Sequence, residues 1–336
     1  MKSPNDELLV IKLLEEATTL QVVRNFLKEK GLHYSASSWE QLRSERLLPA
    51  LKEYKIDIKD LVSLLRTAEE YRLQHVFLYK CLNEENIHLL LDKERVKKIL
   101  VKMELEDILL NPKILEQPQV PTIVDVRWDK QGLVIKIIET RISEKFLKES
   151  FNEDDTINRT YKKISERAVN VVRLRMSGEL ELCLASQSSK SYKKNLDDIW
   201  NLIDEIIPRR NFSEIYLNKA KNLLWINREH YAQNLLRFSS LGARNDNGTL
   251  FSIASGSRDA NLFKDDGANV SAEGFVSNEG YCEMYNIWFT TQEDEEIPTE
   301  EIHVTISGEL NEFSINPNSR EENYEYVINS LRRLNS

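Results

Sequence analysis

The sequence predicts an α+β protein, in which an N-terminal all-helical bundle precedes a β-rich domain of two related halves, each ending in a hairpin and a helix. Two observations lead to this prediction. The apolar residues change from helical spacing to alternation near residue 122. The tetrapeptide SGEL occurs at 177–180 and at 307–310, each time between two strand-like runs. The 336 residues are enough for two or three domains.

Residues 1–116 are predicted to form the helical bundle, similar in size to death-like modules. Ser38 opens a capping-box pattern, and Pro49 is expected to kink the helix that follows. Asp60 is placed to cap the next helix. An apolar stripe at helical spacing then predicts one long helix over 61–82.

Residues 117–121 are predicted to be a linker, because they hold two prolines through which a helix does not continue. The second domain is placed at 122–336, with halves at about 122–208 and 212–336. Its first half opens with a strand–turn–strand pattern. The polar segment 143–167 after this hairpin is expected to be a helical connection.

The first SGEL turn is predicted to join two strands of a half-buried antiparallel pair. Leu174 and Leu182 would meet on the inner face, and Arg175 would pair with Glu181 on the outer face. The second SGEL is followed by the same order of strand and helix, out of phase by one residue, which a β-bulge would restore. This order favours an internal repeat. Chance similarity between two ordinary ββα units is the alternative.

Charge is distributed unevenly along the chain. The net charge of −9 divides into −2 over residues 1–159, +6 over 160–244 and −13 over 245–336. Cations interleaved with aromatic residues can bind a phosphate backbone and stack on bases. The residues predicted to contact a nucleic acid or a partner are Arg173, Arg175, Lys190, Lys193, Lys194, Arg209, Arg210 and Tyr192. The alternative is a solvated surface, or one neutralised by the acidic end of the chain or by another subunit.

Familiar catalytic motifs are missing from the sequence. It has no phosphate-binding glycine loop, no zinc-protease motif, no nucleophile elbow and no paired CxxC. The nearest nuclease pattern is Asp125 on one strand with Glu139 and Arg141 on the next, where magnesium nucleases place two carboxylates and a lysine. Arg141 replaces that lysine, and strand parity does not oblige Asp125 to face Glu139. We therefore predict no catalytic residue, metal ligand or cofactor.

The order of parts resembles the centromere protein N family. The resemblance rests on residues 37–79, SSWEQLRSERLLPALKEYKIDIKDLVSLLRTAEEYRLQHVFLY, and on the hairpin and bipartite β-rich region after them. In that family a pyrin-like helical domain precedes a β-rich region. The resemblance implies binding close to DNA through a basic surface and pairing with another subunit. It contains no diagnostic motif, so it assigns no role to any residue, and the acidic final third of this chain departs from the family.

The sequence therefore favours a non-enzymatic interaction or adaptor subunit that binds a protein partner and, through 160–244, a nucleic-acid backbone. The alternative is a metal-dependent nuclease or other phosphodiester enzyme centred on the 125–141 hairpin. Three dispersed cysteines without ligand spacing favour a reducing, cytoplasmic location. No apolar run approaches the roughly 18 residues of a membrane helix, so a membrane is not expected as a partner. Self-association is left open.

Overall fold

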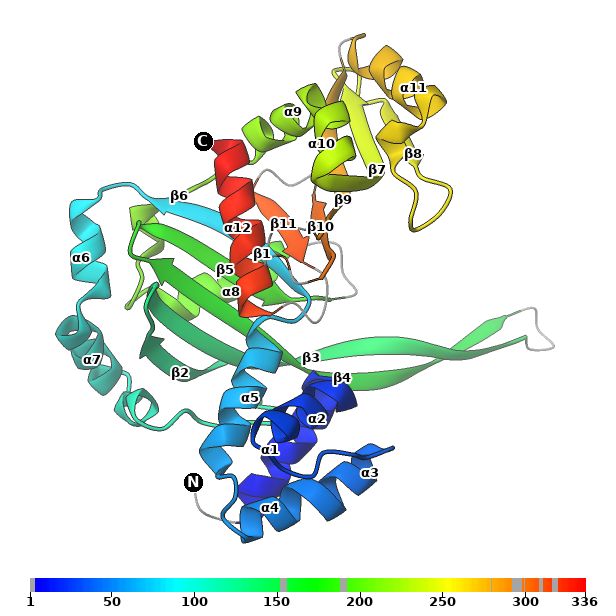
Figure 1. The fold of residues 1–336 in the computed structure, drawn as a ribbon. Coiled ribbons are helices and arrows are strands. Elements are labelled where there is room, and N and C mark those ends of the chain that lie inside the picture. The colour runs from blue at the N-terminus through cyan, green and yellow to red at the C-terminus, as the bar shows by residue number, and fades with distance from the viewer. Residues whose placement is uncertain are drawn as a thin grey trace.

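The computed structural model describes residues 4–151, 156–187, 192–278, 280–291, 298, 300–307, 311–315 and 320–336. These residues form one antiparallel sheet of eleven strands in the order β2-β3-β4-β5-β1-β11-β10-β9-β7-β8, with β6 paired to β1. Helices pack on the sheet and beside it (Figure 1). The predicted α+β class is confirmed.

The strands are β1 Gln74–Cys81, β2 Thr122–Trp128, β3 Gly132–Phe151, β4 Ile157–Arg175, β5 Glu179–Ala185, β6 Phe212–Glu214, β7 Leu236–Asn245, β8 Leu250–Ala254, β9 Gly280–Phe289, β10 Ile302–Ile306 and β11 Glu312–Ile315. The α-helices are α1 Pro4–Ala17, α2 Leu20–Glu29, α3 Trp39–Leu42, α4 Leu48–Lys52, α5 Ile58–Glu70, α6 Glu85–Leu91, α7 Lys93–Lys102, α8 Lys193–Ile203, α9 Asn218–Ile226, α10 Arg228–Asn234, α11 Asp266–Val276 and α12 Glu321–Asn335. Short turns of other helix types are η1 Arg43–Leu47, η2 Glu106–Leu109, η3 Arg209–Asn211 and η4 Leu262–Lys264.

Helices α1 to α5 form a bundle around a core of their own. The side chain of Ser38 accepts a hydrogen bond from the backbone amide of Gln41, which is the first half of the predicted capping box, whereas the Gln41 side chain accepts from the backbone amide of Ser37. Asp57 caps α5 in place of Asp60, and the two residues form a reciprocal capping box. Pro49 is accommodated near the start of α4, after the π-helical turn η1.

The predicted helix over 61–82 is wrong in its second part. Helix α5 ends at Glu70, and residues 74–81 form β1, which pairs with both β5 and β11. Val76 of this strand packs in the hydrophobic core on one face of the sheet, and Phe77 packs in the core on the other. Residues 1–116 are therefore not all helical, because a strand from within them lies at the middle of the sheet. Independent folding of that segment stays a prediction.

The two faces of the sheet are covered by different helices. One core includes α6, α7, η2 and α8, and the other includes α9, α10 and α12. Helix α8 follows the β4–β5 hairpin and α12 follows the β10–β11 hairpin, so the two ββα units place their helices on opposite faces. An evolutionary relationship between the two halves stays a prediction.

The first SGEL turn begins one residue earlier than predicted, over residues 176–178. Leu174 lies opposite Leu180, and Arg173 lies opposite Glu181, a register shifted by two residues. Gly178 has a φ of +81°, and a Cβ added there would lie 2.4 Å from Cδ1 of Ile87, so the turn requires glycine. The face of this hairpin that carries Arg175 and Glu181 was expected to point to solvent, but it is buried against α12. Residues 308–310 of the second SGEL lie outside the described residues.

No helix in the described part of the chain combines the length and the apolar character that crossing a bilayer requires.

Candidate interaction surface

Arg173 was predicted to be a surface cation, but it is a buried residue of β4 and only 4% exposed. Its guanidinium lies over the rings of Tyr71 and Tyr324, 5.0 and 4.9 Å from their centroids. It also donates to the carbonyl oxygen of Glu70 and to Sγ of Cys183, both at 3.1 Å. Burial raises the pKa of Cys183 to about 11, so this contact is with a neutral thiol. Arg173 is thus stabilised within the fold.

Arg175 is also buried, 6% exposed, in a network around the fully buried Glu181. Its Nε and Nη2 donate to the two carboxylate oxygens of Glu181 at 2.7 and 3.0 Å, and two further bonds reach Glu325 on α12. Tyr324 and Arg332 donate to Glu181 at 2.9 and 3.2 Å. Burial alone would raise the pKa of Glu181, but the neighbouring guanidinium groups outweigh it and lower the pKa below its ordinary value. The expected Arg175–Glu181 pair exists, inside the protein.

Tyr192 is likewise unavailable as a stacking platform. It is buried, and its ring stacks on His75 of β1 with 4.3 Å between ring centroids. His75 in turn bonds Glu312 of β11 through Nδ1 at 2.5 Å. The predicted aromatic contact therefore belongs to the junction between β1 and β11.

The other predicted cations in the described residues are exposed. Lys193 and Lys194 start α8, whereas Arg209 and Arg210 follow its far end. The eleven residues of α8 span about 16 Å between these two ends, but the side chain of Arg209 reaches back along the helix. Arg209 also forms an ion pair with Asp197 at 2.7 Å. Lys190 lies outside the described residues.

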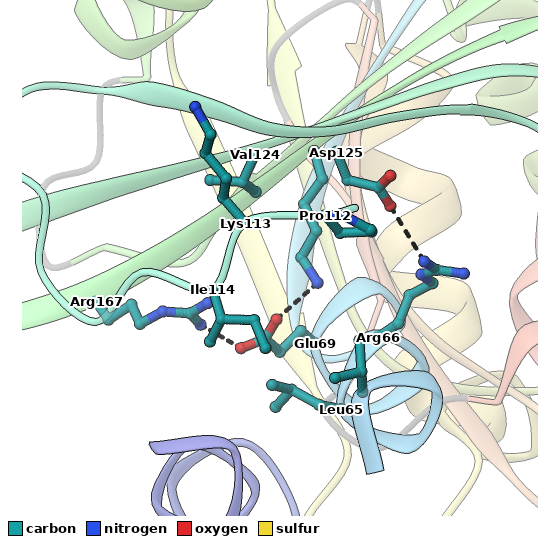
Figure 2. A pocket seen from close by; sticks show the side chains of 11 residues that line it. Leu65, Arg66, Glu69, Pro112, Lys113, Ile114, Val124, Asp125 and Arg167 are labelled. Carbon is teal, nitrogen blue, oxygen red and sulfur yellow. Dashed lines mark hydrogen bonds and ion pairs between the residues drawn. The ribbon is translucent and has the colours of Figure 1, made fainter. Parts of the chain in front are cut away.

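Buried ion pairs join α5 to the sheet (Figure 2). Glu69 lies between Lys136 of β3, at 2.6 Å from its Nζ, and Arg167 of β4, to which it also bonds. Asp125 of β2 accepts from Arg127 at 2.7 Å and lies 3.5 Å from Arg66. These contacts fix the bundle against β2, β3 and β4.

Glu70 completes this junction from the last turn of α5. It is fully buried, 2.5 Å from Nη2 of Arg127, 3.7 Å from Nζ of Lys136 and 4.0 Å from Nη2 of Arg173. Burial opposes its charge, but these three cations together lower its pKa below the ordinary value. The carboxylate is therefore ionised and paired.

The two acids of the nuclease alternative lie apart and are paired with cations. Asp125 lies opposite Lys136, on the face that packs against α5. Glu139, three residues further along β3 and so on the opposite face, binds Nε of Arg141 at 2.7 Å and Nδ2 of Asn170 at 2.9 Å. Within the described ranges, no three histidine, cysteine or acidic side chains are grouped as metal ligands.

The most exposed regular structure is a two-stranded arm, which we define as residues 142–151 and 157–166. Here β3 and β4 continue as an antiparallel pair beyond the ends of the neighbouring strands β2 and β5. Figure 1 shows the arm projecting from the body of the protein. The prediction of a helical connection over 143–167 is wrong. Ile142 and Phe146, an even number of residues apart, together with the β-branched residues of 157–164, were the available signal for strands.

One face of the arm carries an apolar stripe, which we define as Ile142, Phe146, Ile157 and Tyr161. Phe146 and Tyr161 lie directly opposite each other, with 5.8 Å between ring centroids in an edge-to-face arrangement. The four side chains are 48–68% exposed. On the same face the opposed residues Glu144 and Lys163, and Glu149 and Arg159, stand between them. Large exposed apolar groups on a projecting element are typical of a binding surface.

The other face of the arm carries lysines. Lys145 lies directly opposite Lys162, and Lys148 is opposite Thr160 on the same face. Like charges directly opposite each other destabilise a strand pair. None of the three forms an ion pair within the described part of the chain, whereas Glu149 and Arg159 on the other face pair at 2.6 Å. We call Lys145, Lys148 and Lys162 the lysine face.

The root of the arm is braced by side-chain bonds to the end of β5 and to surrounding loops. Arg141 donates to the carbonyl of Ala185 at 2.6 Å, and Arg167 donates to that of Leu115 at 2.8 Å. Thr140 donates to the carbonyl of Pro118 at 2.7 Å. The predicted linker 117–121 therefore lies bound against the arm root, and the arm projects from a fixed base.

No protein-family model matches this chain, and no curated protein matches it either. The resemblance to the centromere protein N family thus stays a prediction.

Proposed function

We propose that this chain is a non-enzymatic adaptor subunit that binds an acidic protein partner through its arm. The observation that supports the proposal is the arm itself, an exposed ribbon with the apolar stripe on one face and the lysine face on the other.

A two-stranded ribbon gains little stability of its own in water. Its outer edges also present unpaired backbone groups that another chain can bind. The apolar stripe offers four large side chains, and burying each fully would contribute about 1.5–3 kcal/mol. Contact with a partner supplies the burial that the arm lacks in the free chain.

The chemistry of the lysine face indicates the character of the partner. Carboxylates placed near Lys145 and Lys162 would relieve the repulsion between these opposed ammonium groups. Because Arg141, Arg167 and Thr140 brace the root, less conformational freedom is lost when the partner binds. The partner that fits the arm therefore places apolar groups against the apolar stripe and carboxylates against the lysine face.

A nucleic-acid backbone is less well supported as a partner. Arg173, Arg175 and Tyr192 are buried, and the exposed Arg209 is already paired with Asp197. Phosphates could also neutralise the lysine face, but the exposed apolar stripe favours a protein.

The test compares arm variants in the cells that naturally make the chain. Tagged wild type and the double variant Phe146→Ser/Tyr161→Ser are purified, and co-purifying proteins are quantified. The matched control is Leu250→Ser, which removes an exposed apolar side chain from the edge strand β8. We expect one acidic protein to be lost with the double variant and retained with the control.

A second variant, Lys145→Glu/Lys162→Glu, tests the charge of the partner. We expect it to release the same protein as the apolar-stripe variant. Retention of every co-purifying protein by both arm variants contradicts the proposal, provided that the purified variants keep the circular dichroism spectrum of the wild type.

A further inference from the structure

A pocket of about 540 Å³ lies in the second half of the protein, away from the arm. Leu223 of α9 and Tyr231 of α10 form one wall, and Tyr326 and Leu334 of α12 form the other. Its volume is within the range of about 300–1,000 Å³ typical of small-molecule sites.

The back of the pocket is a fixed part of the sheet. Leu236 of β7 lies directly opposite Phe289 of β9, and both side chains are buried. The ring of Tyr326 meets that of Phe289 edge to face, with 5.7 Å between centroids. The walls are therefore already positioned by the hydrophobic core, so a ligand need not order them.

One cation lines this mainly apolar pocket. Arg333, in the last turn of α12, is exposed and donates to Oγ of Ser330 at 3.2 Å within its own helix. It forms no ion pair with any residue that the structure describes. Its neighbour Arg332, by contrast, is bound to Glu179 and Glu181. The guanidinium of Arg333 is thus free to take a carboxylate in the two-point geometry that this group favours.

We propose that this pocket binds an amphipathic monocarboxylate, with the carboxylate on Arg333 and an unbranched apolar chain against Tyr231, Phe289 and Tyr326. At about 30 Å³ for each methylene-sized group, a chain of about ten carbons occupies about 300 Å³ and fits the available volume. This site is independent of the arm and of the proposed adaptor function.

Titration calorimetry with the full chain and sodium decanoate tests the proposal. We expect one site with a dissociation constant of about 10–100 μM. Decanol, which keeps the chain and lacks the charge, should bind at least about tenfold more weakly, and so should decanoate to Arg333→Gln. The control Arg210→Gln, which removes an exposed cation elsewhere, should leave the affinity unchanged.

Leu235→Trp provides an independent test by filling the pocket. This residue lines the pocket and is partly exposed, so the larger side chain should block decanoate while the circular dichroism spectrum stays unchanged. Failure of decanoate to bind the wild type at about 1 mM, well above the expected constant, overturns the proposal. Equal affinities for decanol and decanoate, or equal losses in the two arginine variants, overturn the assignment of the carboxylate to Arg333.

Discussion

Arg175 on β4 and Glu181 on β5 form a buried two-point ion pair, with Nε–Oε1 and Nη2–Oε2 distances of 2.7 and 3.0 Å. The same carboxylate accepts bonds from Tyr324 and Arg332 of α12. Glu181 is therefore one of the side chains that connect the hairpin of the first half to the C-terminal helix.

Replacing Glu181 with glutamine should lower the free energy of unfolding by about 3–5 kcal/mol, because it removes the fully buried carboxylate of the network and leaves Arg175 with Glu325 as its remaining counterion. Urea denaturation monitored by circular dichroism gives the value. The matched change Glu149→Gln breaks the pair with Arg159 on the exposed arm and should cost less than about 1 kcal/mol. Similar losses in the two variants would show that the buried network does not stabilise the fold as described.

The stability should depend on pH through Glu70 and Glu181, whose pKa values are lowered in the folded protein. Such groups stabilise the fold fully above their unfolded pKa, near 4.3, and the contribution is lost as the pH falls through the folded pKa. Burial raises the pKa of Glu325, so that residue acts in the opposite direction. We expect the unfolding free energy to fall below about pH 4.5, and the double variant Glu70→Gln/Glu181→Gln to show a shallower fall. Parallel profiles for variant and wild type would exclude these two residues as the cause.

Cutting the chain within 117–121 should not separate its two parts. Strand β1 remains paired with β5 and β11, and the ion pairs of Glu69 and Glu70 still hold α5 to the sheet. A protease site introduced at Gln119, an exposed residue, allows the cut to be made. Gel filtration should show the two pieces eluting together. Separate elution of a folded fragment would instead support the predicted division into domains at this linker.

Binding to duplex DNA or RNA should be weak, with a dissociation constant of about 10⁻⁴–10⁻⁶ M at physiological salt, as for non-specific electrostatic contact. Fluorescence anisotropy with labelled duplexes measures it. The variant Lys193→Glu/Lys194→Glu should bind more weakly to all sequences, with a flatter slope of log affinity against log salt. Nanomolar affinity would contradict this expectation and favour the nucleic-acid function predicted from the basic segment.

The spacing of apolar residues predicted the amphipathic helices of the second domain. Ile199, Trp200 and Ile203 of α8 recur at helical spacing in the sequence and pack in one core, and Tyr324 and Leu331 of α12 do the same in the other. Each of these helices is amphipathic, and its burial pattern follows from its own 3.6-residue period.

Strand β1 was missed because it is buried on both faces. The run from His75 to Tyr79 therefore lacks alternation, and Tyr71, Val76 and Tyr79 also fit a helical spacing. A strand at the centre of a sheet is specified by neighbours distant in sequence, here β5 and β11.

The sequence did not reveal which charges are buried. Arg173 and Arg175 alternate with apolar residues as solvent-facing side chains would. They are enclosed by segments distant in sequence, which are α12, about 150 residues further along, and, for Arg173, the end of α5 with Tyr71. The arm was missed for the opposite reason. It buries little surface, so its polar composition resembles that of a connection, and its strands are held by pairing with each other.

Photo-crosslinking from the arm tests the proposed function most directly. A photoreactive phenylalanine replaces Phe146 on the apolar stripe, or Leu250 on β8 as the control, in the cells that naturally make the chain. We predict that Phe146 gives one dominant crosslink to an acidic protein, that Leu250 does not, and that Lys145→Glu/Lys162→Glu abolishes it. No crosslink from position 146, or the same products from both positions, would contradict the assignment of the arm as the partner-binding element.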